Sequence, residues 1–344
     1  MLALSIQQVI KKNDLKYVIN QTKGIYRQRK GKKFIYIDHE GHAVTAKETL
    51  DRITRLVLPP AWEQVWICPF ENGHLQAIGY DVKGRKQYRY HAEWSRIRNE
   101  QKYERLYDFG KKLPALRMEI QKSLRTRQLT KDKVAAIALS IIDNTGIRIG
   151  NTSYERENGS YGLTTLKNRH AQINGNITFF RFKGKKGVQQ LVPLRNSALT
   201  HYLKQVKEIP GQELFQYYDE TGAVHSLDSG DLNDYLKRNM HEDFTCKDMR
   251  TWTGSVTAVQ LMAEMMSNGM PTTQRKSLLD IIDGVAQKLG NTRAVCRKYY
   301  IHPALLTAYE EQTTATLLKA LIKNKTVATA AIEKALLSFL KRQL

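Results

Sequence analysis

The chain has 344 residues, of which 41% are hydrophobic and 26% are charged, and this is the composition of a folded globular protein. Its length predicts two domains, and no segment reaches the ~18 uninterrupted apolar residues that a membrane span requires. Lys and Arg outnumber Asp and Glu by 55 to 33, which gives a net charge of +22. Such an imbalance favours nucleic acid as the partner. A membrane surface is not favoured, because the N-terminal sequence MLALSIQQVIKKND carries neither a cleavage site nor a myristoylation pattern.

Short strands separated by turns are predicted between residues 33 and 90, in KFIYID, WEQVWICP, LQAIGYD and KGRKQYRY. One helix is expected within this sheet, from Thr45 to Leu56, because its apolar residues recur at helical spacing and Thr45 can cap it. Helix-rich sequence begins near Trp94. We therefore expect a small β-rich N-terminal domain over residues 1–97, with a net charge of +8, and a larger domain over residues 98–344, with a net charge of +14.

The basic residues are most concentrated between Lys23 and Lys33, in KGIYRQRKGKK. A basic run is often only a solvated surface. Here the run contains Tyr26 and is followed by the alternating sequence FIYID, as in surfaces that follow a nucleic-acid backbone. We therefore predict that Lys23, Arg27 and Arg29 contact DNA.

The larger domain is predicted to be mainly helical, with helices over Gln101–Thr126 and Lys131–Gly146 and again from residue 198 to the end. Residues 170–194 interrupt this pattern with turn signals at Asn174-Gly175 and at Gly184 to Gly187, so they predict a three-stranded antiparallel meander. The expected fold class is α+β: a small β-rich lobe and a larger helical lobe with a three-stranded sheet.

Metal, nucleotide and thiol chemistry find little support in the sequence. The only dense acidic cluster, Asp228, Asp231 and Asp234, lacks the spacing of a calcium loop and is better explained as an acidic helix N-terminus. There is no phosphate-binding G-x-x-x-x-G-K-[ST] motif, and the nine histidines show no ligand spacing. The three cysteines are far apart in sequence and fit packing roles in a reducing compartment. We expect no metal and no cofactor.

Arg, Lys and Tyr side chains suffice for one metal-free reaction of phosphodiesters. A tyrosine can attack phosphorus and form a covalent phosphotyrosine. Two arginines can stabilise the charged transition state, and a lysine can protonate the leaving oxygen. Suitable candidates are Arg148 in NTGIRIGN, Lys185 in the predicted hairpin turn, Arg250 in FTCKDMRTW and Tyr300 in GNTRAVCRKYYIHP. Taken singly, each has an ordinary explanation as a surface or core residue.

The set in this order resembles the type IB DNA topoisomerases, in particular their compact bacterial and poxvirus branch. The resemblance covers roughly residues 20–303 and rests on seven ordered phrases: LPPAWEQVWICP, GRKQYRYH, RIGN, YGLTTLKNRH, FRFKGKKG, FTCKDMRTW and GNTRAVCRKYYIHP. It implies a DNA clamp, with the N-terminal domain closing over the duplex.

The resemblance also implies the roles of individual residues. The nucleophile follows a C-R-K-x-Y pattern, which selects Tyr300 over Tyr299. The two catalytic arginines fall on Arg148 and Arg250, and the general-acid lysine falls on Lys185. A further position, His in many members, falls on Asn291. Because Asn cannot take up a proton, it can only stabilise charge.

Helix geometry adds a test that is independent of the family. Nine residues along one helix amount to about 900°, so Asn291 and Tyr300 would face opposite sides of a single helix. We therefore predict a break after Gly290-Asn291-Thr292, with Tyr300 on a following segment.

In the N-terminal domain the segment GRKQYRY matches the family's DNA-contacting segment, and Arg and Gln can read base edges while Tyr can stack or bind phosphate. The predicted contacts there are Arg85, Gln87, Tyr88 and Tyr90. A plain edge strand is the alternative. Lys247 in KDMR is also predicted to contact DNA, and it distinguishes this chain from the tyrosine recombinases, whose second arginine normally ends an H-x-x-R phrase.

The expected function is relaxation of positive and negative supercoils through transient cleavage of one strand and religation, without ATP or metal. The expected partner is double-stranded DNA, and we expect a monomer without an obligate protein partner or membrane, acting in the cytoplasm on the bacterial nucleoid. The alternatives are a tyrosine site-specific recombinase and a non-catalytic basic DNA-binding protein, which would bind DNA in a salt-sensitive way without forming a covalent complex.

Overall fold

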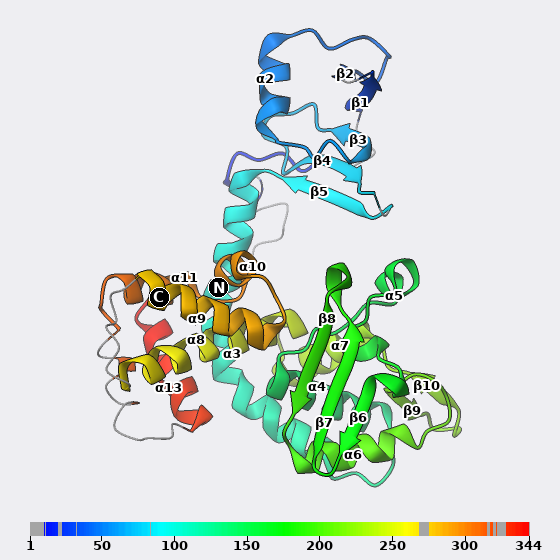
Figure 1. Ribbon diagram of the computed structural model, residues 1–344, viewed down its shortest axis with the longest axis vertical. Helices are drawn as coiled ribbons and strands as arrows, with labels where there is room; N and C mark the ends of the chain where they lie inside the picture. The colour runs from blue at the N-terminus through cyan, green and yellow to red at the C-terminus, as the bar shows by residue number, and fades with distance from the viewer. Residues whose placement is uncertain are drawn as a thin grey trace. The chain divides into compact units, whose positions relative to one another are not determined.

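The computed structural model describes residues 10, 12–19, 23–31, 33–82, 84–267, 275–314, 317–318, 321 and 328–343. The chain divides into two compact units, residues 1–101 and residues 102–344 (Figure 1). One contains a five-stranded sheet, and the other is mainly helical with a three-stranded antiparallel sheet. The predicted α+β fold class is confirmed.

The first unit is built on an antiparallel sheet of strand order β2-β1-β3-β4-β5. The strands are β1 (Ile25–Lys30), β2 (Lys33–Ile37), β3 (Glu63–Ile67), β4 (Leu75–Tyr80) and β5 (Lys86–Tyr90). Most of the basic run that begins at Lys23 therefore forms strand β1. The sequence interpretation did not predict this strand, because charged residues occupy both of its faces and hide the alternation of apolar and polar residues. This strand pairs with both β2 and β3.

Helix α2 (Lys47–Arg55) covers one face of this sheet. Its Ile53 belongs to a core that also contains Ile25, Val65, Ile67 and Ala77 from the strands. The predicted cap at Thr45 is wrong: Ala46 occupies the N-cap position and makes no side-chain hydrogen bond, so packing of the apolar stripe rather than capping holds this helix in place.

Helix α3 (Ala92–Leu124) begins in the first unit and continues through the second. Its first turns carry Trp94 and Ile97, which form a small core with Ile10 and Leu15. This extra packing explains why the helix begins nine residues before the predicted start at Gln101.

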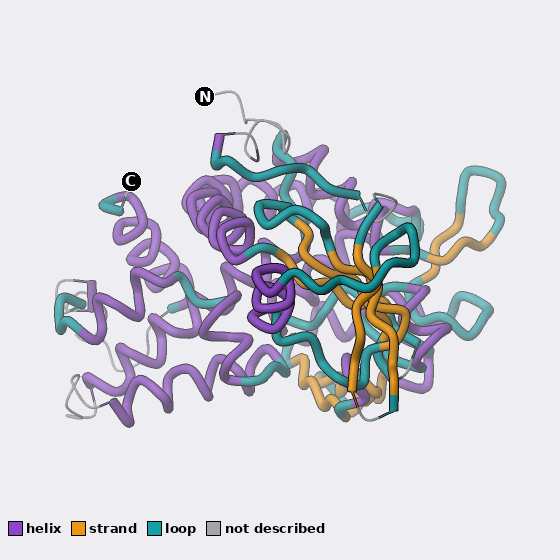
Figure 2. The backbone as a smooth tube through the Cα atoms, turned by 90° about the horizontal axis from the view of Figure 1, so that it is seen from above, coloured by secondary structure: helices purple, strands orange, loops and turns teal. Residues whose placement is uncertain are grey.

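The second unit is arranged around α4 (Lys131–Thr145), whose apolar residues are almost completely buried. Helices make up most of this unit (Figure 2). The elements that surround α4 or follow it are α5 (Thr152–Asn158), α6 (Ser197–Lys207), β9 (Gln216–Tyr218), β10 (Val224–Ser226), α7 (Ser229–Met240), α8 (Cys246–Ser267), α9 (Arg275–Leu289), α10 (Arg293–Tyr299), α11 (Pro303–Glu310) and α13 (Thr329–Lys341).

The predicted meander is confirmed as β6 (Ala171–Asn174), β7 (Ile177–Lys183) and β8 (Gln189–Leu194), paired in that order. Gly175 supplies the positive φ of 58° that the first turn needs. The second turn is a short 3-10 segment, Lys185–Gly187. The hairpin β9–β10 had no counterpart in the sequence interpretation.

Candidate active site

The junction between α9 and α10 carries two of the predicted site residues. Helix α9 ends at Leu289, and Gly290 follows with a φ of +57°, a conformation that favours glycine. Thr292 then caps α10 by accepting from the backbone N of Val295 at 3.4 Å. The predicted break is confirmed, since Asn291 precedes this short helix and Tyr300 lies at its C-terminal end.

A second loop brings Arg148 to this junction. Gly146 ends α4 in the left-handed conformation, and Gly150, with a φ of +108°, touches the backbone of Gly162. The carbonyl of Arg148 accepts from the backbone N of Leu163 at 2.7 Å, which fixes the loop. The guanidinium Nη2 of Arg148 donates to the side-chain oxygen of Asn291.

Arg250 lies on α8 with only 3% of its surface exposed. Its Nη2 donates to the carbonyl oxygen of Leu289 at 3.1 Å, and its guanidinium lies 5.0 Å from the ring centre of Tyr300. Gly254, one turn further along α8, allows this approach, because a Cβ there would lie 2.4 Å from the carbonyl oxygen of Tyr300.

The cluster contains buried hydrogen-bond donors without partners: Nε and Nη1 of Arg250 and Nδ2 of Asn291. An unpaired buried donor is costly, and charged donors more so. Two of these donors belong to the arginine beside Tyr300, and they suit an oxyanion ligand, for which the tetrahedral oxygens of a phosphodiester are suitable acceptors.

The charges of the cluster act on the tyrosine. Burial raises the pKa of the Tyr300 phenol, but the positive charge of Arg250, a hydrogen bond from its side chain and the charge of Arg148 together more than offset burial, so the pKa lies below its ordinary value. Burial, followed by the charge of Arg250, lowers the pKa of Arg148. The arrangement therefore favours the phenolate, the nucleophilic form of tyrosine.

The structure thus brings Arg148, Arg250, Asn291 and Tyr300 together. Lys185 lies on the exposed turn between β7 and β8. Strand β7, which leads into this turn, is bonded to the segment that also binds the Arg148 loop. The carbonyl of Lys183 at the end of β7 accepts from the backbone N of Tyr161 at 2.8 Å, two residues before Leu163.

Two residues that the sequence interpretation missed hold the C-terminal end of α10. Lys102 Nζ donates to the carbonyl of Tyr299 and lies 5.4 Å from the ring centre of Tyr300. Tyr103 Oη donates to the carbonyl of Lys298 at 3.2 Å. Both lie on α3, about 200 positions earlier in the chain, and no local pattern distinguishes them from other helical residues.

Two of the predicted DNA contacts around β5 already bind another side chain of the protein, and the other two are exposed. Asp81 binds Arg85 through an ion pair of 2.6 Å and accepts from Gln87 Nε2 at 3.1 Å. Tyr88 and Tyr90 are 48% and 45% exposed, and their rings stack with centres 6.0 Å apart. The two tyrosines therefore form an exposed aromatic pair on one face of the strand.

Three of the four predicted basic contacts are exposed, whereas the fourth binds the backbone of its own unit. Lys23, Arg29 and Lys247 are exposed. Arg27 is used internally, because its Nη2 donates to the carbonyls of Pro59 and Trp62 at 3.0 and 2.7 Å. Burial lowers the pKa of the Arg27 guanidinium.

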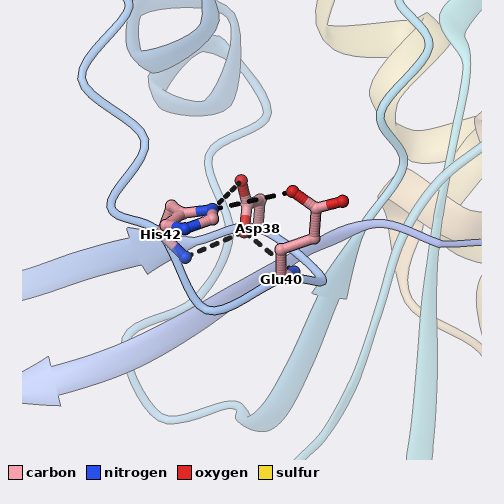
Figure 3. A group of neighbouring side chains, drawn as sticks. All are labelled: Asp38, Glu40 and His42. Carbon is pink, nitrogen blue, oxygen red and sulfur yellow. Dashed lines mark hydrogen bonds and ion pairs between the residues drawn. The ribbon is translucent and has the colours of Figure 1, made fainter.

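Potential metal-ligating groups occur in the first unit. Asp38, Glu40 and His42 have ligand-type atoms within 4.8 Å of one another (Figure 3), but Oδ1 of Asp38 accepts from the backbone N of Glu40 and His42, so the carboxylate stabilises the turn after β2. The acidic cluster predicted to start a helix does so, since Asp228 caps α7 by accepting from the backbone N of Asp231.

The chain is similar to known proteins over most of its length. A family model described as eukaryotic DNA topoisomerase I, catalytic core, matches residues 85–326, and one described as bacterial DNA topoisomerase IB, N-terminal domain, matches residues 33–81. DNA topoisomerase 1B of Acanthamoeba polyphaga mimivirus is 33% identical over 294 residues, 83% of this chain and 88% of that protein. DNA topoisomerase 1B of Vaccinia virus (strain Copenhagen) is 23% identical over 268 residues, 75% and 79% of the two chains.

The fold and these matches define an isomerase of the DNA topoisomerase I class. More particularly, the chain belongs to the type IB DNA topoisomerase family, with an N-terminal domain of the bacterial kind. The predicted family is thereby confirmed, and the recombinase alternative is not favoured. A crystal structure of the XerH site-specific recombinase bound to palindromic difH is similar with a TM-score of 0.38 and 15% identity, over 59% of this chain and 50% of that one, and carries no argument at that level.

Among the residues that the structure describes, no helix combines the length and the apolar character needed to cross a membrane.

Proposed function

We propose that the chain relaxes supercoiled double-stranded DNA through a covalent intermediate on Tyr300. The phenol oxygen attacks phosphorus and forms a 3′-phosphotyrosyl bond, while the bond from phosphorus to the 5′ oxygen breaks. The cut strand then rotates about the intact one, and the 5′ hydroxyl attacks the phosphotyrosine to restore the strand. The observation that supports this proposal is that Tyr300 lies beside the buried Arg250, which carries unpaired donors, and under the charge of the half-buried Arg148.

Arg148, Arg250 and Asn291 stabilise the transition state in this proposal. Charge accumulates on the non-bridging oxygens of phosphorus, and donors already fixed in a buried site stabilise it without reorganisation. Two of the donors belong to the permanently charged Arg250, whose fork geometry suits a phosphate. Asn291 contributes Nδ2, because its oxygen already accepts from Arg148.

Lys185 is proposed as the general acid. The departing 5′ oxygen is an alkoxide and needs a proton, whereas the incoming phenolate does not. Lys185 lies on a turn at the exposed end of a hairpin, and we propose that its Nζ extends from this turn to a phosphodiester held by the cluster. The proton passes from this Nζ to the 5′ oxygen as its bond to phosphorus breaks.

The first unit is proposed to grip the duplex through Tyr88 and Tyr90 of β5, Arg85 and Gln87 beside them, and the basic residues Lys23 and Arg29. Lys247, in the first turn of α8, is proposed as a phosphate contact close to the site. We further propose that the protein acts as a monomer, without an obligate protein partner, on nucleoid DNA in the cytoplasm.

Relaxation of supercoiled plasmid in EDTA tests the proposal. The wild-type protein is expected to relax both positively and negatively supercoiled plasmid, and denaturation during the reaction should trap protein on DNA. Tyr300→Phe, which removes only the phenol oxygen, should abolish both results, whereas Tyr299→Phe should retain them. Activity in Tyr300→Phe, or a requirement for magnesium in the wild type, would contradict the proposal.

A further inference from the structure

Gly290, in the α9–α10 junction, lies between the two residues that Arg250 and Arg148 bind. The carbonyl of the residue before it, Leu289, accepts from Arg250, and the side chain of the residue after it, Asn291, accepts from Arg148. Gly290 therefore joins the two acceptors that the arginines use, and the Lys185 turn must lie close to this segment to serve the same phosphate.

Gln190, the second residue of β8, makes such a contact. A Cβ on Gly290 would lie 2.0 Å from Oε1 of Gln190, so the amide occupies the space that any other side chain would need. At its other end, Cγ of Gln190 lies 2.8 Å from where a Cβ on Gly184 would be. The side chain of Gln190 thus fills the space between Gly290 and Gly184, the residue directly before Lys185.

Strand pairing determines where Gln190 lies. It pairs with Phe182 on β7, so the two side chains share a face of the sheet, and Phe182 is buried. The turn beyond is closed by the backbone N of Gly184, which donates to the carbonyl of Val188 at 2.8 Å. The strand therefore holds Gln190 in place, while Lys185 sits on the exposed turn.

We propose that Gln190 is a positioning residue that holds the Lys185 turn against the Gly290–Asn291 segment. This inference rests on the proposed function, in which Lys185 protonates the leaving 5′ oxygen. Proton transfer requires donor and acceptor within about 2.6–3.2 Å, and a misplacement of ~1 Å can cost ~100-fold in rate. The contact of Gln190 with both glycines sets the distance between the acid and the phosphate.

A leaving-group substitution tests the proposal through a readout that a general loss of stability would not change. Single-turnover cleavage is measured on a DNA with the natural 5′ oxygen and on one with sulfur at that atom, because a thiolate is far less basic than an alkoxide and leaves without a proton. Lys185→Ala is expected to be slow on oxygen and near wild type on sulfur. Gln190→Ala should follow the same pattern, with a loss of about 10- to 100-fold on oxygen.

Gly184→Ala provides a second route to the same contact. Its φ of −88° suits alanine, so the new methyl group acts by displacing Gln190 rather than by straining the backbone. Gly184→Ala should show the same loss on the oxygen substrate alone. If Gln190→Ala fails to fold, the Gly184→Ala result tests the positioning role of Gln190. Gln189→Ala, at the exposed neighbouring position on the other face of β8, is the matched control and should cleave both substrates normally.

The two hypotheses fail in different ways. If Lys185→Ala is equally slow on both substrates, then Lys185 is not the acid and the proposed function needs revision. If Lys185→Ala recovers on sulfur while Gln190→Ala and Gly184→Ala do not, the acid role stands and the positioning role of Gln190 is overturned.

Discussion

Lys102 shows how a residue can be unfavourable for folding and useful for chemistry. Burial, and secondly the positive charge of Lys247, lower its pKa from the ordinary 10.5 to about 7. Its ammonium nevertheless donates to the carbonyl of Tyr299 and lies beside the ring of Tyr300. Cations at a helix C-terminus stabilise the last carbonyls, so Lys102 fixes the end of α10 from which the nucleophile projects.

We expect Lys102→Met to slow strand cleavage by about 10-fold, because the charged hydrogen bond that positions the nucleophile is removed. The same change should raise stability near neutral pH. The folded pKa lies below the unfolded one, so the lysine disfavours folding most at pH below about 7, and this cost disappears as the pH rises towards 10.5.

Thermal unfolding between pH 6 and 10, together with single-turnover cleavage, measures both effects of Lys102→Met. The advantage in stability over wild type should be largest at the low end of the range and vanish at the high end. Lys102→Arg, which keeps a charged donor, should cleave faster than the methionine variant. A methionine variant that is less stable at every pH would contradict the assignment.

The residues of the candidate site show what the sequence could predict. Arg148, Arg250, Asn291 and Tyr300 were selected by chemistry and resemblance, and the structure brings them together. Gln190 and Lys102 could not be found in this way, because their partners Gly290 and Tyr299 lie about 100 and 200 positions away. Such contacts arise from tertiary packing and leave no local periodicity in the sequence.

At the scale of elements, α13 is fixed to the other helices of the second unit by a half-buried ionic network. Arg117 on α3 donates to Glu333 on α13 at 2.7 Å and to Asp143 on α4 at 2.8 Å, and Trp252 Nε1 on α8 donates to Glu333 at 3.1 Å. Because Arg250 lies two residues before Trp252, this network also stabilises the helix that carries a site arginine.

Glu333→Ala is expected to destabilise the fold by about 1–3 kcal/mol, since the indole and part of the guanidinium lose their acceptor. Burial raises the pKa of Glu333, but Arg117 and Trp252 more than offset this, and the pKa is lowered overall. The carboxylate therefore stabilises the fold at neutral pH, and that contribution is lost as the pH falls through the folded pKa.

Urea unfolding of Glu333→Ala and wild type at pH 7 and at pH 3 tests this prediction. The difference in the free energy of unfolding should be clear at pH 7 and smaller at pH 3. Lys334→Ala, at the neighbouring position on α13, is the control and should match wild type at both values. An equal difference at both pH values would show that the carboxylate charge does not contribute.

At the scale of the whole molecule, the net charge of +22 is informative about the partner but not about which basic residues bind it. Of the three candidates in the first basic run, Lys23 and Arg29 are exposed, whereas Arg27 donates to backbone carbonyls within its own unit. The sequence could not separate them, because the carbonyls of Pro59 and Trp62 reach Arg27 only after the sheet forms. Substitution of Lys23 or Arg29 should therefore affect DNA binding, whereas substitution of Arg27 should affect stability.

Binding of duplex DNA by the Tyr300→Phe protein at several salt concentrations separates these consequences. Removal of one basic side chain that binds a phosphate should reduce the slope of log affinity against log salt by about 0.9, so Lys23→Gln with Arg29→Gln should reduce it by up to ~1.8. Tyr88→Ala with Tyr90→Ala should weaken binding by about 10-fold with the slope unchanged, because neutral side chains release no counterions.

Arg27→Gln should leave the slope of log affinity against log salt unchanged and lower the unfolding temperature, since the backbone carbonyls that Arg27 binds lose their donor. A reduced slope in Arg27→Gln with unaltered stability would instead place that arginine on the DNA.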